Sequence, residues 1–294
     1  MVELHTGRVE AAHGRYFRIK EGEVITDCVT RGKKGGVACG DHVEFNLTHS
    51  GSGVIERVLP RNNLLYRSDE MRTKLIAANV DQVLVVVAAV PMFREELLIR
   101  CILACEVEDI PVRIILNKID LPESAALEAY LQHYVALGYP LVPVSALGDL
   151  STLEAAMAGK TSVFVGASGM GKSSLLNRLV PEANAAVGEI SIALDAGKHT
   201  TTHAQLHALP RGGDIIDSPG MQEFGLQHLD MDTLMAAFPE IRQRKGECRF
   251  YNCQHLKEPS CAVRNALETG DISAVRMRVY ESLAMQIAKR ASGR

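Results

Sequence analysis

The sequence of 294 residues predicts a chain of three modules: a small antiparallel β-barrel, a central α/β domain on a parallel sheet, and a helical C-terminal domain. Three observations indicate this division. The first 60 residues alternate polar and apolar side chains around glycine-bearing turns, short apolar runs then alternate with helical segments, and cysteines crowd between residues 248 and 261. We expect the modules to span residues 1–66, 67–228 and 229–294.

Composition restricts the class of protein. With 47% hydrophobic and 23% charged residues, the chain is typical of a soluble globular protein and not of a disordered or fibrous one. The longest apolar run, residues 83–90, is too short to cross a bilayer, and the first ten residues do not read as a signal peptide. Seven cysteines, an odd number, favour a metal site and reduced thiols. We therefore expect a cytoplasmic protein with no membrane partner.

Charge is distributed unevenly along the chain. Residues 1–67 carry 10 basic and 8 acidic side chains, residues 68–240 carry 11 and 22, and residues 241–294 carry 11 and 5. Because a polyanion is attracted to basic surfaces, the two ends of the chain, and not its acidic middle, are expected to contact nucleic acid.

The N-terminal module, residues 4–60, reads as short strands without a long helical period. Its size fits an oligonucleotide-binding (OB) barrel of five strands. The basic loop at residues 31–36 would give this barrel a flexible cationic finger. A solvated turn on an ordinary barrel explains the loop equally well, so the loop alone does not decide for nucleic acid.

The central module follows a polar stretch at residues 61–74 and alternates buried strands with helices. Such alternation is typical of a doubly wound parallel sheet, whose ligands lie beyond the carboxyl ends of the strands. The expected strands are residues 82–90, 112–116, 141–144, 162–165 and 214–216, and the expected helices are residues 94–108, 122–137 and, in the last module, 273–290.

The most specific motif is a phosphate-binding loop of the pattern GxxxxGK[ST]. It follows an apolar strand and opens a helix, which is the context that the motif requires. Its glycines let backbone N–H groups face phosphate oxygens, Lys172 supplies a cation to the outer phosphates, and Ser173 supplies a hydroxyl to Mg²⁺. The expected phosphate-binding residues are Gly166, Ala167, Ser168, Gly169, Met170, Gly171, Lys172, Ser173 and Ser174.

A second motif, NKID at residues 117–120, selects the base. The Asp120 carboxylate can accept hydrogen bonds from both the N1–H and the exocyclic amine of guanine, and adenine offers no such pair of donors. The sequence therefore predicts GTP over ATP. Neighbouring residues would hold the loop, cover the base and offer a backbone N–H to the guanine oxygen. The expected base-binding residues are Asn117, Lys118, Ile119, Asp120, Ser145 and Ala146.

Two further motifs complete the pattern of a GTP-hydrolysing site. The DSPG motif offers a metal-linked carboxylate, Asp217, and a glycine that senses the terminal phosphate, Gly220. The GKHTTT motif offers Thr200 or Thr201 to the same Mg²⁺. Its His199 is a candidate for positioning the attacking water, although a solvated loop side chain explains a lone histidine equally well.

The order of these motifs is unusual, because the base-binding elements precede the phosphate loop. Ordinary GTPases begin with the phosphate loop. Joining the usual termini and opening the chain elsewhere yields the same sheet, since the termini of such domains lie close together. The sequence thus predicts a circularly permuted GTPase whose second switch leads into the C-terminal module. Hydrolysis could then act on whatever that module binds.

A metal cluster is expected in the C-terminal module. Three thiolates and one imidazole within fourteen residues make a complete tetrahedral zinc set of the structural kind, with no open position for catalysis. The alternative is a set of cysteines buried by chance. Next to Phe250 and Tyr251, a basic zinc module would be similar to a nucleic-acid-binding knuckle. The expected ligands are Cys248, Cys253, His255 and Cys261.

Over nearly its whole length the sequence resembles the bacterial ribosome small subunit-dependent GTPase A family (RsgA/YjeQ type). The matching segments are NKID, SAL, GASGMGKSS, GKHTTT, DSPGMQEFGL and CRFYNCQHLKEPSCAV. The resemblance implies an N-terminal OB-type β-barrel, a central α/β P-loop GTPase domain that is circularly permuted, and a C-terminal helical zinc-binding domain. It also implies binding of GTP and GDP with Mg²⁺, one structural Zn²⁺, and partnership with the small ribosomal subunit and its rRNA late in maturation, with hydrolysis stimulated by the subunit. We expect a monomer.

One position is expected to affect the intrinsic rate of GTP hydrolysis. Met221 follows the DSPG motif, where many GTPases carry the glutamine that orients water, and a thioether cannot do this by hydrogen bonding. Slow intrinsic turnover is expected, with a partner completing the site; Gln222, where the family often has arginine, is not expected to compensate.

Two alternative functions remain on the sequence alone. A small-molecule kinase could use the same phosphate loop, and a preference for ATP would identify it. A non-enzymatic RNA-binding protein could hold the nucleotide as a structural ligand, an interpretation that Met221 favours.

Overall fold

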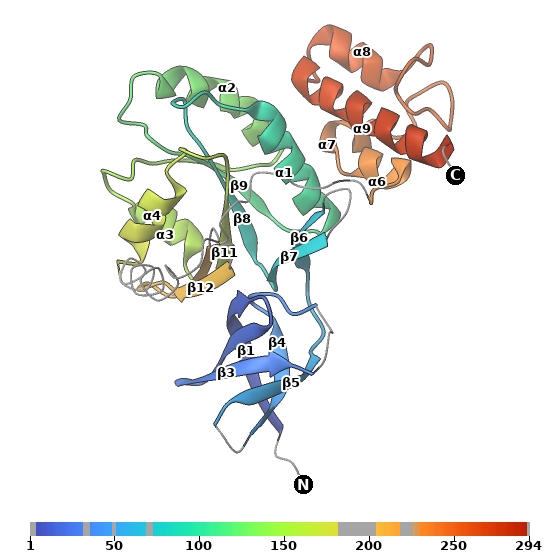
Figure 1. Cartoon of the computed structure of the whole chain (residues 1–294). Coiled ribbons are helices and arrows are strands. Elements are labelled where there is room, and N and C mark those ends of the chain that lie inside the picture. Colours follow the sequence, from blue (N-terminus) through green and yellow to red (C-terminus); the bar gives the residue numbers. More distant parts are fainter. Residues whose placement is uncertain are drawn as a thin grey trace.

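The structure is a computed structural model and describes residues 4–31, 36–48, 51–68, 73–181, 204–217, 226 and 228–292. Figure 1 shows a barrel at the N-terminal end of the chain, a central sheet flanked by helices, and a group of C-terminal helices beside α1. Among the described helices, none has the length and apolar character needed to cross a membrane.

The barrel contains the five strands that its length suggested. They are β1 (Leu4–His13), β2 (Tyr16–Glu21), β3 (Val24–Thr30), β4 (His42–Leu47) and β5 (Gly53–Val58). Their order is β1-β2-β3-β5-β4, and β4 pairs back with β1, so the barrel closes. Alternate side chains, among them Val9, Phe17 and Phe45, point inward and form a separate small core.

Among the described residues, the central sheet has five parallel strands, all near the expected residues. In spatial order they are β10 (Leu141–Pro143), β9 (Val112–Leu116), β8 (Gln82–Val87), β11 (Thr161–Val165) and β13 (Asp214–Asp217). A sixth strand, β12 (Ala204–Ala208), runs antiparallel beside β13. The sequence analysis did not identify β12, because AQLHA alternates apolar and polar residues over only five positions and contains a single large apolar residue, so its strand signal is weak.

Helices cover both faces of this sheet, as the doubly wound prediction required. On one face lie α1 (Glu95–Val107) and α2 (Ser124–Ala136), and on the other lie α3 (Ser151–Met157) and α4 (Lys172–Leu179) (Figure 1). Successive residues of β8 serve the two faces, because Val83 and Val85 join one core while Leu84 and Val86 join the other. The fold thus buries β8 and β11 completely and leaves the carboxyl ends of the strands free for a ligand.

The C-terminal region consists of four described helices around the cysteine cluster. They are α6 (Met231–Ala236), α7 (Pro239–Arg242), α8 (Ala262–Thr269) and α9 (Ala274–Ser292). The Asp230 carboxylate caps α6 by accepting a hydrogen bond from the Thr233 N–H at 2.8 Å. Met277, Tyr280 and Leu283 of α9 are buried in the same core as α1, so this region packs on the central domain.

The barrel is joined to the central sheet through the backbone. At the end of β1, Ala11 and Ala12 pair with Gln205 and Ala204 of β12, so that barrel and sheet form one sheet of eleven strands. The polar stretch at residues 61–74 also proved to be structured: β6 (Leu64–Ser68) pairs with β7 (Thr73–Ala78) in a hairpin. Burial of Leu65 and Ile76 on this hairpin explains why a mostly polar segment forms strands.

Candidate functional site

The expected base-binding and phosphate-binding loops meet at the carboxyl edge of the sheet. Asn117, which is buried, joins them: its Nδ2 donates to the Met170 carbonyl at 2.9 Å, and its Oδ1 accepts from the Ala146 N–H at 3.1 Å. One side chain therefore holds the NKID loop, the 145–147 loop and the phosphate loop together. These segments lie after three different strands, β9, β10 and β11.

Glycine is required at two positions of the phosphate loop. Gly166 has φ +148°, and a Cβ built there would lie 2.3 Å from the Val86 carbonyl oxygen. Gly171 has φ +93°, and its Cβ would lie 2.2 Å from Asn117 Nδ2. Any side chain at these positions would separate the loop from β8 or from the base-binding loop. The backbone therefore passes close to its neighbours, and α4 begins directly afterwards at Lys172.

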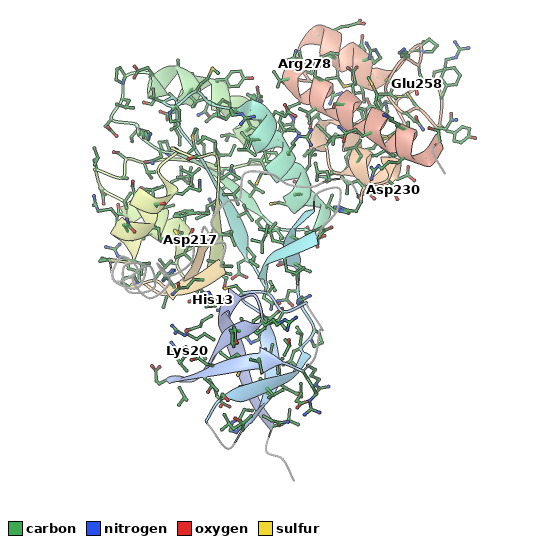
Figure 2. All side chains as sticks on the ribbon, viewed as in Figure 1. His13, Lys20, Asp217, Asp230, Glu258 and Arg278 are labelled. Atoms are coloured by element: carbon green, nitrogen blue, oxygen red, sulfur yellow. The ribbon has the colours of Figure 1, made fainter. Side chains whose placement is uncertain are left out.

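The Lys172 ammonium group lies within the curve of this loop, where it donates to the carbonyls of Gly166 at 2.7 Å and Ala167 at 2.8 Å. Burial lowers the pKa of Lys172, and the Asp217 carboxylate acts in the opposite direction. Burial raises the pKa of Asp217, against the effects of His207 and Lys172. Figure 2 labels Asp217 at the end of β13. A cation and a carboxylate thus share a partly dry edge of the sheet, an arrangement suited to phosphate and a divalent metal.

The base-binding loop is shaped by several hydrogen bonds. Ser145 Oγ donates to the Asp120 carboxylate and accepts from the Leu147 N–H at 3.1 Å. Lys118 adopts φ +64°, and its Nζ donates to the carbonyls of Val90 at 2.8 Å and Gly169 at 2.7 Å. The Asp120 carboxylate is thereby oriented by the 145–147 loop, while Lys118 bridges to the phosphate loop.

Arg178 belongs to the same site, although the sequence did not indicate it. From the last turn of α4, its guanidinium donates to the Ala146 carbonyl at 2.7 Å and to the Gly148 carbonyl at 3.0 Å. The contact fixes the loop that follows β10. A basic residue in the last turn of a helix is common, so no local pattern could have identified this role.

Several predicted residues lie outside the described part of the chain. They are His199, Thr200, Thr201, Gly220, Met221 and Gln222. The other predicted nucleotide-site residues are all described, and they lie in the loops named above, in the first turn of α4 or, for Asp217, at the end of β13.

The four predicted metal ligands converge in one cluster, with all donor atoms within 4.8 Å of one another. The Cys248 and Cys261 sulfurs are 3.8 Å apart, and His255 Nδ1 lies 3.6 Å from Cys248 Sγ and 3.3 Å from Cys261 Sγ. Tetrahedral Zn²⁺ would place two sulfurs about 3.8 Å apart and a sulfur and a nitrogen about 3.6 Å apart. The donor set and its spacing are therefore compatible with zinc.

The loop between these ligands is ordered by a carboxylate. Glu258 accepts hydrogen bonds from the backbone N–H groups of Gln254 and Leu256, each at 2.8 Å, and of Lys257 at 2.9 Å. Figure 2 labels Glu258 on the side of the C-terminal helices away from the central sheet. The cluster is thus a preformed part of the fold.

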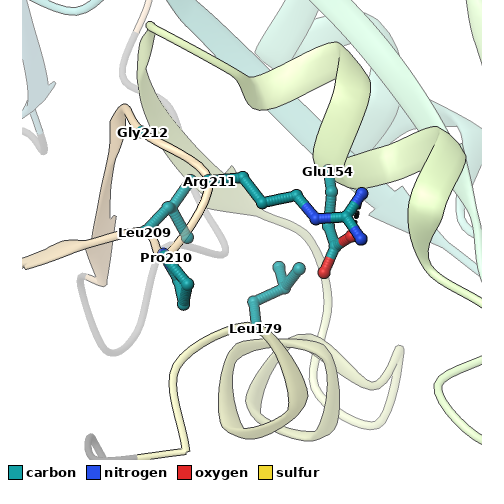
Figure 3. A pocket seen from close by; sticks show the side chains of 6 residues that line it. All are labelled: Glu154, Leu179, Leu209, Pro210, Arg211 and Gly212. Atoms are coloured by element: carbon teal, nitrogen blue, oxygen red, sulfur yellow. Dashed lines mark ion pairs between the residues drawn. The ribbon is translucent and has the colours of Figure 1, made fainter.

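A hollow between the β12–β13 connection and helices α3 and α4 is not a ligand site. It is lined by Leu179, Leu209 and Pro210 and crossed by an ion pair of 3.1 Å between Arg211 and Glu154 (Figure 3). Its volume of about 10 Å³ holds no more than a water molecule.

The comparison with known proteins supports the interpretation of this site as that of a GTPase. The model of the family described as RsgA GTPase matches residues 58–227. The chain is 51% identical over 280 residues to a small ribosomal subunit biogenesis GTPase RsgA from Nitrosospira multiformis, covering 94% of this chain and 89% of that protein. It is 46% identical over 294 residues to the protein of the same name from Burkholderia pseudomallei strain 1710b, covering 98% and 94%.

Solved structures support the arrangement of the modules. The crystal structure of YjeQ from Thermotoga maritima matches with a TM-score of 0.74 at 30% identity, covering 97% of this chain and 99% of that one. YloQ, described as a circularly permuted GTPase, matches with a TM-score of 0.72 at 29% identity, covering 98% and 96%. The predicted fold, including the permutation, is thereby confirmed.

Proposed function

This chain belongs to the RsgA GTPase family, and from that premise we propose that it binds the small ribosomal subunit and acts late in the maturation of that subunit. It is a GTP hydrolase. The relatives that match nearly all of its length are named small ribosomal subunit biogenesis GTPases. The observation that carries the proposal is the Asn117 bridge, because it joins a guanine-selective loop to a phosphate loop in one site.

In the proposed site, Asp120 accepts hydrogen bonds from the guanine N1–H and amine, and Ser145 orients its carboxylate. Asn117 and Lys118 hold the base-binding loop, in which Ile119 lies between Lys118 and Asp120. The Ala146 backbone N–H lies beside the guanine oxygen. The phosphates bind along residues 166–174, where Lys172 supplies the cation. Each of these roles rests on a described side chain or backbone group at the same edge of the sheet.

Hydrolysis proceeds by attack of water on the terminal phosphorus in line with the bond to the bridging oxygen. A P–O bond to water forms, the bond to the bridging oxygen breaks, and GDP and phosphate result. Lys172 and the loop N–H groups stabilise the charge that develops. Ser173 and Asp217, together with Thr201 or Thr200, would hold Mg²⁺, which would supply positive charge to the phosphate oxygens. Gly220 would sense the terminal phosphate and His199 position the water.

We assign one structural Zn²⁺ to Cys248, Cys253, His255 and Cys261, because their donor spacing suits a tetrahedral thiolate and imidazole set. The module boundaries that we propose are 1–66, 67–228 and 229–294. The barrel and the basic C-terminal module are the proposed contacts to rRNA, since both have an excess of basic residues. We further propose that the protein works as a monomer in the cytoplasm, without a membrane partner.

The deciding experiment measures GTP turnover by the purified protein alone, with isolated small subunits, and with large subunits as the control. We expect slow turnover alone, strong stimulation by small subunits only, and loss of turnover in Lys172→Ala. An Asp120→Asn variant should lose most of its preference for guanine over adenine nucleotides. Equal, slow rates with every partner would refute the assignment to the small subunit while leaving guanine binding intact.

A further inference from the structure

A buried ion pair lies where the C-terminal helices meet the central domain. Arg276 of α9 and Glu240 of α7 are 1% and 2% exposed. The Arg276 Nε and Nη2 atoms both donate to the Glu240 carboxylate, the latter at 3.0 Å. Within the described part of the chain, Nη1 has no hydrogen-bond partner. Burying two charges is costly, and apolar residues often stabilise a core equally well, so stability alone does not account for the pair.

The Arg276 guanidinium also contacts two aromatic rings, one on each side of the boundary. Its Cζ lies 5.2 Å from the ring centroid of Phe238, which precedes α7, and 5.5 Å from that of Tyr134 in α2. A desolvated cation over an aromatic face is attracted to it. Behind Phe238, the Tyr280 ring packs edge-on at 5.4 Å and lies 6.5 Å from the His255 ring of the metal cluster. Arg276 thus connects the metal cluster to the central domain.

From Tyr134 the contacts continue to the start of α1. The Tyr134 hydroxyl donates to Glu95 Oε1 at 2.8 Å, and the Tyr130 hydroxyl donates to Glu95 Oε2 at 2.6 Å. Burial would raise the pKa of Glu95, but the His133 ring and the two tyrosine hydroxyls hold it below its ordinary value. Glu95 is therefore ionised, and its carboxylate holds the first residue of α1 to the two tyrosines of α2.

The segment that precedes α1 contacts the loops of the nucleotide site. The Lys118 ammonium group donates to the carbonyls of both Val90 and Gly169, and so joins this segment to the phosphate loop. A Cβ built on Gly169 would lie 3.0 Å from Pro91 Cγ, which shows how closely the two backbones approach. A shift of Glu95 would therefore also shift the phosphate loop.

We propose that Arg276 is a positioning residue for guanine-nucleotide binding. It docks the C-terminal helices on α2, and through Tyr134 and Glu95 this docking holds the segment before α1 against the phosphate loop. By linkage, whatever moves the C-terminal helices changes nucleotide affinity, and nucleotide binding favours the docked arrangement by the same factor. The route runs through the base-binding side of the site and does not require the second switch.

The test measures binding of fluorescently labelled GDP to the zinc-loaded full chain. In Arg276→Met we expect the dissociation constant to rise about five-fold or more, in the usual range of coupling between sites. At saturating GTP the turnover number without a partner should stay unchanged, because the contacts of Arg276 described above do not involve Lys172 or Asp217. The matched control is Arg264→Met, which removes a guanidinium that pairs with Glu281 at 3.1 Å within the C-terminal helices; its GDP affinity should equal that of the wild type.

A second variant separates docking from transmission. Tyr134→Phe keeps the ring beside Arg276 and removes only the hydroxyl that contacts Glu95, so we expect weaker GDP binding with normal zinc content. If both variants bind GDP within two-fold of wild type at full zinc occupancy, the proposal is wrong and the pair is structural. If Arg276→Met fails to fold, Tyr134→Phe decides alone. None of these measurements involves ribosomal subunits, so their failure is distinct from failure of the proposed function.

Discussion

The central domain is joined to its two neighbours by different means. The barrel continues the central sheet through backbone pairing of β1 with β12, whereas the C-terminal helices dock through side chains around Arg276. A backbone joint tolerates most side-chain changes and is disrupted by changes to the backbone itself. A side-chain joint depends on a few buried groups. The comparison teaches that the joint to the barrel rests on backbone pairing, while the joint to the C-terminal helices rests on a few buried side chains that single substitutions, or a partner, can loosen.

The barrel joint contains further backbone contacts, together with side-chain contacts made by one residue, Arg8. The Ala78 N–H donates to the Cys39 carbonyl at 2.8 Å, and Arg8 on β1 adds contacts to Asp214 at 2.6 Å and to Thr161 at 2.8 Å. Gly40 lies so close to β7 that a Cβ built on it would be 2.2 Å from the Ala78 carbonyl oxygen. Backbone from barrel and central domain is in direct contact at this point.

The largest effect is expected from removing the metal, because its loss would disrupt the C-terminal helices and with them the side-chain joint to the central domain. Structural zinc sites contribute on the order of 10 kcal/mol of binding free energy, which is also folding free energy. A strong zinc chelator should therefore expose α8 and α9 to limited proteolysis while the barrel stays protected. Restoring Zn²⁺ should restore protection, which serves as the control. Helices that resist the protease after complete zinc release would contradict the structural role of the cluster.

The next largest effect is expected from Gly40→Ala, a substitution that disturbs the backbone joint between the barrel and the central domain. Gly40 has φ +89°, and the added methyl group would also clash with the Ala78 carbonyl, so we expect a loss of about 3 kcal/mol in unfolding free energy. Urea denaturation measures it. The matched control is Gly14→Ala, since Gly14 has φ +67° but nothing within 4 Å of its added Cβ; this variant should lose only about 1 kcal/mol. Equal losses would show that the close approach at Gly40 is unimportant.

A smaller and pH-dependent effect is expected from Glu95→Gln, which weakens the side-chain joint. At pH 7 the loss should be about 1–2 kcal/mol, because charged hydrogen bonds become neutral ones. The pKa of Glu95 is lowered from 4.5 in the folded state, so the contribution of its carboxylate is complete above pH 4.5 and disappears as the pH falls through the folded-state pKa. The difference between wild type and variant in urea denaturation should therefore shrink below about pH 4.5.

The control for this prediction is the neighbouring Glu96→Gln. The Glu96 side chain is 64% exposed and pairs with Arg100 on the same helix, so its removal should change stability little at any of these pH values. A pH dependence equal to that of Glu95→Gln would assign the effect to general charge and not to the joint.

The smallest effect is expected from Arg211→Ala, which tests whether burial is what makes a side-chain contact matter. The Arg211 side chain is 68% exposed, so its ion pair with Glu154 should contribute less than about 0.5 kcal/mol. Thermal unfolding with and without 1 M salt measures this, with salt expected to remove what little effect there is. A loss of several kcal/mol would refute the distinction between exposed and buried contacts drawn above.

Prediction from sequence succeeded where a short segment carries its own geometry. The NKID motif and the phosphate loop directly follow β9 and β11, close to the expected strands, and the donor atoms of the four residues in the cysteine cluster lie within 4.8 Å of one another. Prediction failed for the β6–β7 hairpin, which lies in a mostly polar segment, and for β12, whose short alternation holds one large apolar residue and whose partner β1 is distant in the sequence. The sequence did not indicate the role of Arg178 either, because its hydrogen-bond partners are carbonyls of another loop.

The sequence by itself determined the chemistry that we propose for this protein, because local motifs bring together the functional groups proposed to bind guanine, phosphate and zinc. It also determined the permutation, since the order of motifs is a property of the chain. Only the tertiary structure decided how the three parts join. The pairing of β1 with β12 and the enclosure of Arg276 between Phe238 and Tyr134 unite segments that are far apart in the sequence, and no local pattern encodes such contacts.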